Sequence, residues 1–331
     1  MDKQAEFLDW VFTDDSNVFR NKNTGEIVFV QAPKRGNAPY ARKKNATLDT
    51  IIRALADNQF DYEVPGTRGG EYRMTHMLFF TGTFSHERYT PEQAWGCMRS
   101  TDLEEAEFEH GAMNKLGANF SSIFGKNGKL TCKEASSSGY PAPHVILVLD
   151  KPVLVKRFVS RTGEVSWRIV DKSILKRLGK DFCSRQRSKC DVEAASAENP
   201  IWPYGTFDIK GLVKHDRFNK FSNGFTYVFK YLIKTITINK YPELMEADSI
   251  EEVRDKSLRT MLYTHYGNKC FRTRDIVFGK AFKDRMYMLP EETEEEKESE
   301  WERIRTIPKW VADKIMETKA ARSGMKNEDE G

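Results

Sequence analysis

Residues 129–150 have the sequence KLTCKEASSSGYPAPHVILVLD, and this segment decides the fold that we expect. Residues 129–134 predict a strand, and residues 144–150 form an apolar run of the length of a buried strand. The serines, glycine and prolines of residues 135–143 predict a loop between them. If the two strands pair antiparallel across this loop, Glu134 lies beside His144.

Strands and helices are intermingled on both sides of this segment. Further strands are expected at residues 72–84, 167–170 and 206–213. Helices are expected from Pro91 to about Phe120, with a break near residues 99–102, and at residues 172–183, 224–236 and 250–263. Thr90 before Pro91 is typical of a helix start. The order lacks the strict alternation of a doubly wound sheet, so the expected class is α+β, with helices packed against an antiparallel central sheet.

Three regions follow one another along the chain. Residues 1–65 are interpreted as an N-terminal appendage, with a basic loop at residues 34–44 and a helix that opens at Thr47. Residues 66–290 are expected to form the main domain, with its core at about residues 72–240. Residues 291–331 are expected to form an acidic linker and a C-terminal helix that carries Trp301, Ile304, Trp310, Val311 and Ile315.

The composition is that of a globular chain. Of the 331 residues, 39% are hydrophobic and 31% are charged, which excludes collagen, low-complexity disorder and a pure coiled coil. No apolar run approaches the ~20 residues that a membrane-spanning helix needs. The five cysteines are scattered and form no CxxC pair, which is typical of reduced thiols. We therefore expect a cytoplasmic protein with no membrane partner.

Positive charge is concentrated in the second half of the main domain. Residues 151–240 contain 19 lysines and arginines against 8 acidic residues, with aromatic residues interleaved. This combination suits a polyphosphate partner, although a solvated basic face is an equally good interpretation of charge alone. The residues expected to contact DNA are Lys172, Lys176, Arg177, Arg185, Arg187, Lys210 and Lys214.

The most informative segment for function is Tyr227-Val-Phe-Lys230-Tyr231-Leu-Ile-Lys234. On a helix, the two tyrosines and two lysines lie within roughly 100° of one another, and the apolar residues occupy the opposite face. A tyrosine can attack a phosphodiester and keep the bond energy as a phosphotyrosine ester. A neighbouring ammonium group favours the phenolate and stabilises the charge that develops on the phosphate.

This segment resembles the YxxKYxxK motif of the HUH endonucleases, in the two-tyrosine class of rolling-circle replication initiators from phages and archaeal plasmids. Two further segments are similar to motifs of that family, in the same order. The strand motif resembles Phe79-Phe80-Thr81-Gly82-Thr83-Phe84, and the approach to the histidine motif resembles Glu134 followed by Gly139-Tyr140-Pro141-Ala142-Pro143-His144. The resemblance covers about residues 72–240.

The resemblance implies a ferredoxin- or RRM-like core and a plasmid or viral replication initiator. Such an enzyme nicks single-stranded origin DNA through a covalent phosphotyrosine and rejoins the strands. Tyr227 and Tyr231 would be the nucleophiles, and Lys230 and Lys234 would stabilise charge. A divalent Mg²⁺ or Mn²⁺ ion would polarise the phosphate. The implied partners are single-stranded or origin DNA and a host helicase.

The histidine motif departs from the family pattern. The family has His-hydrophobe-His, whereas this chain has His144-Val145-Ile146, so Ile146 occupies the position of the second imidazole. Glu134 beside His144 would supply a second ligand, and these two residues are the expected metal ligands.

Three other functions remain open beside the replication initiator. The chain could be a catalytically weakened DNA-binding protein on the same scaffold, a transposase or conjugative relaxase of the same superfamily, or a single-stranded RNA-binding module.

Overall fold

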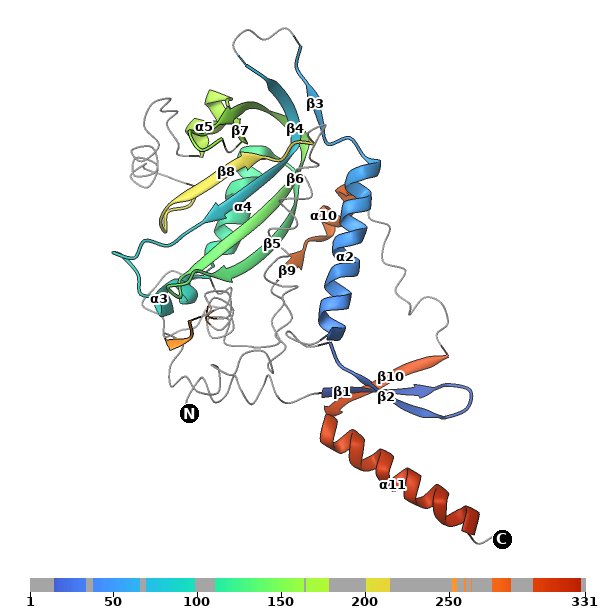
Figure 1. Cartoon of the computed structure of the whole chain (residues 1–331). Coiled ribbons are helices and arrows are strands. Elements are labelled where there is room, and N and C mark those ends of the chain that lie inside the picture. Colours follow the sequence, from blue (N-terminus) through green and yellow to red (C-terminus); the bar gives the residue numbers. More distant parts are fainter. Residues whose placement is uncertain are drawn as a thin grey trace. The chain divides into compact units, whose positions relative to one another are not determined.

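The computed structural model describes residues 15–33, 38–65, 70–98, 111–163, 165–178, 201–214, 252–254, 259, 263, 276–286 and 300–328. The chain forms two compact units. Residues 1–46, 233–246 and 290–331 make the first unit, and residues 47–232 and 247–289 make the second. The boundary falls within helix α2 (Ala38–Asp57), which is coloured blue in Figure 1.

The described part of the first unit is a three-stranded sheet followed by a helix. Its strands are β1 (Asp15–Asn21), β2 (Ile27–Gln31) and β10 (Trp301–Pro308), and the helix is α11 (Lys309–Glu328). The order is β10-β1-β2, and both pairings are antiparallel. Val18 and Ile307 from the sheet pack with Ala312 from α11, which buries one face of the sheet.

Two sequence-based expectations are wrong in this part of the chain. Trp301 and Ile304 were expected on the C-terminal helix, but they lie in β10, and the helix begins only at Lys309. The spacing of the apolar residues fits a helix, yet pairing of residues 301–308 with β1 satisfies their backbone groups in a strand. The basic residues from Arg42 to Lys44 were expected in a loop, whereas they lie in α2, which begins nine residues before Thr47.

The second unit contains an antiparallel sheet, in agreement with the expected α+β class. Among the described residues, seven strands join in the order β3-β4-β8-β7-β6-β5-β9, and β4 also pairs with β6. At its centre the order is therefore β8-β4-β6-β5-β9, as Figure 1 shows. The strands are β3 (Asp61–Glu63), β4 (Tyr72–Gly82), β5 (Asn127–Ala135), β6 (Pro141–Val159), β7 (Val165–Ile169), β8 (Phe207–Gly211) and β9 (Ile276–Phe278).

The described helices of this unit lie before, between and after its strands. They are α3 (Pro91–Cys97), α4 (Ala112–Phe124), α5 (Lys172–Arg177) and α10 (Lys280–Arg285), together with the second half of α2. The expected start of α3 is confirmed, because the Gln93 amide donates to Thr90 Oγ1 and the Gln93 side chain accepts from the Thr90 amide. Helix α5 ends at Arg177, earlier than the expected residue 183.

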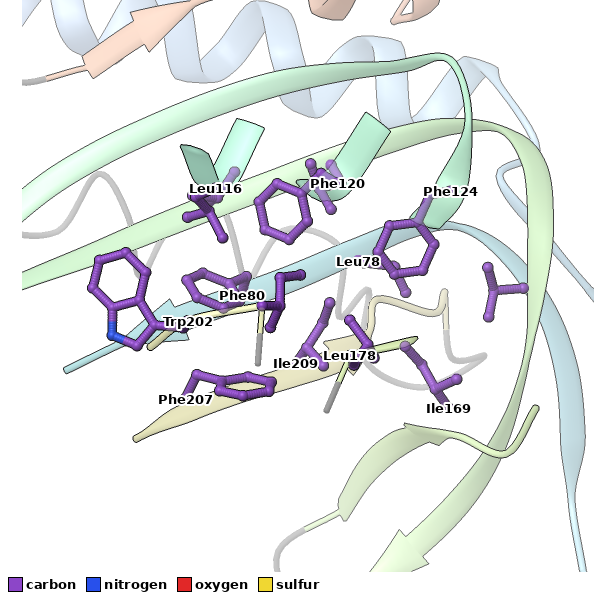
Figure 2. Close-up of a cluster of buried hydrophobic side chains, with 14 of the residues drawn as sticks. Leu78, Phe80, Leu116, Phe120, Phe124, Ile169, Leu178, Trp202, Phe207 and Ile209 are labelled. Carbon is purple, nitrogen blue, oxygen red and sulfur yellow. The ribbon is translucent and has the colours of Figure 1, made fainter. Parts of the chain in front are cut away.

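One face of the sheet packs against α3, α4 and α5 in the main hydrophobic core. Phe80 on β4 lies at the centre, with ring centroids 5.4 Å from Phe120, 6.0 Å from Trp202 and 5.9 Å from Phe207. Figure 2 shows these rings between β4, β8 and α4. Along β6, Val145, Leu147, Leu149, Val153 and Val155 belong to this core. The residues between them on β6 therefore point to the opposite face of the sheet.

The opposite face carries a second layer of buried apolar residues. Phe79, Ile146 and Leu130 are neighbours across β4, β6 and β5, and Ile146 and Leu130 have no exposed surface. Helix α10 packs closely on β5 at Gly128, where a Cβ atom would lie 2.4 Å from the Cα atom of Phe282. A residue without a side chain is needed at position 128 for this approach.

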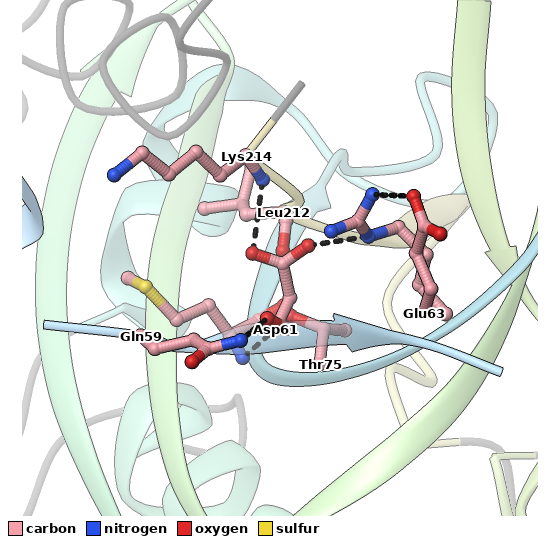
Figure 3. A network of polar contacts seen from close by, with 8 residues as sticks. Gln59, Asp61, Glu63, Thr75, Leu212 and Lys214 are labelled. Atoms are coloured by element: carbon pink, nitrogen blue, oxygen red, sulfur yellow. Dashed lines mark hydrogen bonds and ion pairs between the residues drawn. The ribbon is translucent and has the colours of Figure 1, made fainter. Parts of the chain in front are cut away.

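A buried polar network fixes the strands at the far end of the sheet (Figure 3). Asp61 on β3 accepts the backbone N–H of Lys214 at 3.2 Å and forms an ion pair with Arg73 on β4, whose Nε atom lies 2.6 Å from Asp61 Oδ2. Thr75 Oγ1 donates to the carbonyl of Leu212 at 2.6 Å. These contacts connect β3, β4 and the end of β8. Burial is the main influence on Asp61 and raises the pKa of its carboxyl group, against the opposing hydrogen bond from Lys214 and charge of Arg73.

The raised pKa of Asp61 predicts a pH dependence of stability. Because the pKa of Asp61 in the folded chain lies above its ordinary value of 3.8, the folded chain binds this proton more tightly than the unfolded chain does. Its contribution to stability therefore falls as the pH rises from 3.8 through the raised pKa. The measurement is denaturant unfolding of the wild type and Asp61→Asn across this pH range. The free energy of unfolding of the wild type should fall relative to that of the variant as the pH rises. A difference that moves in the other direction would mean that the Arg73 charge outweighs burial.

Candidate functional site

His144 and Glu134 lie together on the face of the sheet that points away from α4. His144 on β6 is opposite Cys132 on β5, and Glu134 is opposite Ala142, two residues along the same face. His144 Nε2 and Glu134 Oε2 are 3.3 Å apart, and both residues are buried. The expectation that Glu134 lies beside His144 is confirmed. The pairing that produces it is antiparallel, with a turn at residues 136–140.

Thr81 holds the other side of the His144 ring. Thr81 is directly opposite His144 in the β4–β6 pairing, and its Oγ1 atom is 3.2 Å from His144 Nδ1. The Phe79 ring lies nearly parallel to the imidazole, with centroids 5.9 Å apart. Both ring nitrogens therefore face oxygen atoms, and the orientation of the imidazole is fixed. Sequence reasoning quoted Thr81 in a strand motif but did not assign it this contact, which depends on strand register.

The pair has the donor chemistry for a divalent cation. A carboxylate oxygen and an imidazole nitrogen suit Mn²⁺ and, with several retained waters, Mg²⁺. Adjacent ligand atoms of an octahedral ion with bonds of ~2.1 Å are about 3 Å apart, close to the 3.3 Å between Glu134 Oε2 and His144 Nε2. The Thr81 hydroxyl at Nδ1 is the type of contact that orients a metal-binding histidine. The two residues therefore fit a cation as a partial ligand set.

A third ligand is not found in the part of the chain that the structure describes. No group of three or more His, Cys, Asp or Glu residues there is arranged to hold a metal ion. Ile146 occupies the position of the second histidine in the family that the sequence resembles, and it has no exposed surface. Asp150, which shares its strand with His144, instead forms an ion pair with Arg285 at 2.7 Å.

A charged edge continues the site on β8. Asp208 is opposite Thr81, and Lys210 is opposite Phe79, so both lie on the His144 side of the sheet. Their side chains form an ion pair of 3.2 Å, with the Asp208 side chain 58% exposed. Lys210 was expected to contact DNA, and the structure brings it to the same face as His144. Asp208 was missed, because only the register between β4 and β8 connects it to this face.

The other residues expected to bind DNA are spread over the fold. Lys172 and Lys176 are exposed on α5. Arg177, on the same helix, donates to the carbonyls of Ser122 and Ile123 at the end of α4, which gives its guanidinium group a structural role. The Lys214 backbone belongs to the Asp61 network. Outside the described residues lie Arg185, Arg187, Tyr227, Lys230, Tyr231 and Lys234.

In comparisons with protein-family models, curated proteins and solved structures, the chain matches none of them significantly. A search of the described residues finds no helix that is both long and apolar enough to span a membrane.

Proposed function

We propose that the protein nicks single-stranded DNA through a covalent phosphotyrosine and rejoins the strands, as an initiator of rolling-circle replication. The observation that carries this proposal is the contact between His144 and Glu134, 3.3 Å apart on adjacent strands at the centre of the sheet. An imidazole and a carboxylate in contact on a central strand pair supply part of the ligand set of a divalent ion that could also bind a phosphate.

The connectivity of the sheet also supports the proposal. Along the chain the order is β4, then α3 and α4, then β5 and β6, then β7, α5 and β8. Leaving aside β7, which extends the hairpin with β6, the order in space is β8-β4-β6-β5. A strand–helix–strand–strand–helix–strand unit with its first and third strands at the centre is the arrangement of a ferredoxin- or RRM-like core. Helices α3, α4 and α5 cover one face. His144 lies on the other face, where α10 packs on β5.

The proposed reaction assigns distinct roles to the residues. The phenolate of Tyr227 or Tyr231 attacks the scissile phosphorus, and the bond to the 3′ oxygen of the upstream fragment breaks. The protein then holds the downstream fragment as a 5′-phosphotyrosine, and the leaving oxygen takes a proton to become a 3′ hydroxyl. Lys230 and Lys234 stabilise the charge on the phosphate oxygens. A divalent ion bound to His144 and Glu134 would polarise the phosphate.

The direct test is a search for the covalent intermediate. The protein is incubated with 5′- and 3′-labelled single-stranded DNA of the replicon that encodes it, with Mn²⁺ present. We expect a labelled protein band that survives denaturation and carries only the downstream label. Cleavage without any covalent band would contradict the phosphotyrosine mechanism, and complete absence of cleavage on every strand tested would contradict the proposed function.

The two-ligand site predicts a low affinity for the metal ion. A cation held by two side chains binds weakly, so nicking should need roughly millimolar Mn²⁺ or Mg²⁺. His144→Ala leaves one ligand and should abolish cleavage. Thr81→Val, which removes only the hydroxyl at His144 Nδ1, should raise the metal concentration needed by about 10–100-fold and leave cleavage at saturating metal. Cleavage that persists in EDTA, or an active His144→Ala variant, would contradict the assignment.

A second candidate function is a DNA-binding protein without nicking activity on the same scaffold. It is favoured by the complete burial of Ile146, which leaves His144 and Glu134 as the partial ligand set. In that case the Thr81–His144–Glu134 contacts are a structural polar chain. Binding of single-stranded DNA with no covalent band, and with no response to Mn²⁺, would identify this function.

A further inference from the structure

The hairpin formed by the second half of β6 and by β7 presents basic and aromatic side chains in a row. Lys156 on β6 is directly opposite Tyr72 on β4 and Arg168 on β7, and Phe158 is the next residue of β6 on the same face. We name Tyr72, Lys156, Phe158 and Arg168 the hairpin row. The alternate residues Val155 and Trp167 are buried in the core, so the hairpin row lies on the face that points away from it.

Each aromatic ring of the hairpin row is in contact with a cation. Lys156 Nζ lies 5.2 Å from the centroid of the Tyr72 ring, and Arg168 Cζ lies 4.1 Å from the centroid of the Phe158 ring. Phe158 is 39% exposed, a high value for a phenylalanine. An arginine at this distance from a ring holds its guanidinium plane in a defined position, and that plane is itself a stacking surface.

The charge around the hairpin row is mostly positive. Residues 151–170 contain five lysines and arginines and a single acidic residue, Glu164. Arg157, on the other face of β6, forms an ion pair with Glu71 at 3.5 Å, so part of this charge is compensated locally. A positively charged surface with planar groups is complementary to a single-stranded polyanion whose bases are open to stacking.

We propose that the hairpin row is a binding site for single-stranded DNA, in which Lys156 and Arg168 contact phosphates and a base stacks on Phe158 and Arg168. This inference rests on the proposed function for its choice of ligand. Residues 144–158 of β6 connect the hairpin row to the Glu134–His144 pair over about 45 Å of strand, with an irregularity in the pairing to β4 between Val148 and Val153.

The test uses the full-length protein and a fluorescein-labelled oligonucleotide of twenty thymidines, with affinity measured by anisotropy. Phe158→Leu keeps an apolar side chain and removes the ring, and it should weaken binding by at least about fivefold. Arg168→Lys keeps the charge and removes the planar group, and it should weaken binding while leaving the salt dependence unchanged. The matched control is Val159→Ala, a neighbouring residue that is 47% exposed and has no ring, and its affinity should equal that of the wild type.

A twenty-base-pair duplex separates stacking from charge. Its bases are already stacked, so Phe158→Leu should leave duplex affinity unchanged. Equal weakening for the single strand and the duplex would overturn the proposal, and so would wild-type affinity in both Phe158→Leu and Arg168→Lys. Thermal unfolding identifies a variant that fails to fold, in which case the other variant decides.

Two separate measurements distinguish this inference from the proposed function. The covalent band reports nicking, whereas anisotropy reports binding at the hairpin row. Loss of affinity in Phe158→Leu with no covalent band in the wild type would support the inference and contradict the nicking activity. A covalent band with unchanged affinity in the variants would do the reverse.

Discussion

Ile146→His is expected to lower the free energy of unfolding by about 2–4 kcal/mol. The substitution restores the His-hydrophobe-His pattern of the family that the sequence resembles. However, Ile146 has no exposed surface and lies between Phe79 and Leu130. An imidazole there would lose the packing of the isoleucine and bury polar atoms. The measurement is urea unfolding, with Ile146→Val as the matched control, for which a cost of about 0.5–1.5 kcal/mol is expected.

The opposite result would change the interpretation of the site. If Ile146→His is as stable as the wild type and lowers the Mn²⁺ concentration needed for nicking, position 146 is accessible to a cation. The Glu134–His144 pair would then be part of a larger metal site. Destabilisation of the expected size means that the apolar layer on this face is part of the folded core. Metal binding would then be restricted to Glu134 and His144.

Tyr227→Phe combined with Tyr231→Phe is expected to abolish the covalent protein–DNA band completely. Only two hydroxyl groups are removed, and both aromatic rings are retained. Without a phenol oxygen the proposed reaction has no nucleophile. Each single variant should retain part of the nicking activity if the two tyrosines act in turn. The measurement is the yield of the labelled band at saturating Mn²⁺.

Tyr62→Phe is the matched control for the double variant. Tyr62 is 43% exposed on β3, and loss of its hydroxyl group should leave the covalent band unchanged. A covalent band of undiminished yield in the double tyrosine variant would exclude both residues as the nucleophile. A band reduced equally in Tyr62→Phe would show a general effect of tyrosine hydroxyl groups on binding.

Local signals predicted much of the second unit. The Thr90–Gln93 capping contacts follow from residue types at fixed spacing, and the β5–β6 pairing follows from two strand patterns joined by a turn. The length of β6 did not follow, because the charged residues Asp150 and Lys151 interrupt its apolar pattern. Pairing with β4 and β7 continues the strand through them to Val159.

The part of the site that depends on pairing between strands distant in sequence could not be predicted. Glu134 and His144 are close in sequence, so their contact could be inferred from one hairpin. Thr81 contacts His144, which lies 63 residues further along the chain. Asp208 is on the same face because it is paired with Thr81, 127 residues before it. A sequence pattern read in short windows carries no information on that register.

The pairing of β1 with β10 has a consequence for synthesis on the ribosome. Residues 22–300 are translated between β1 and its partner at residues 301–308. At 5–20 residues per second, the β1–β2 hairpin waits for on the order of tens of seconds with one edge unpaired. A two-stranded hairpin is marginally stable in water, so the three-stranded sheet is expected to assemble only after translation of β10.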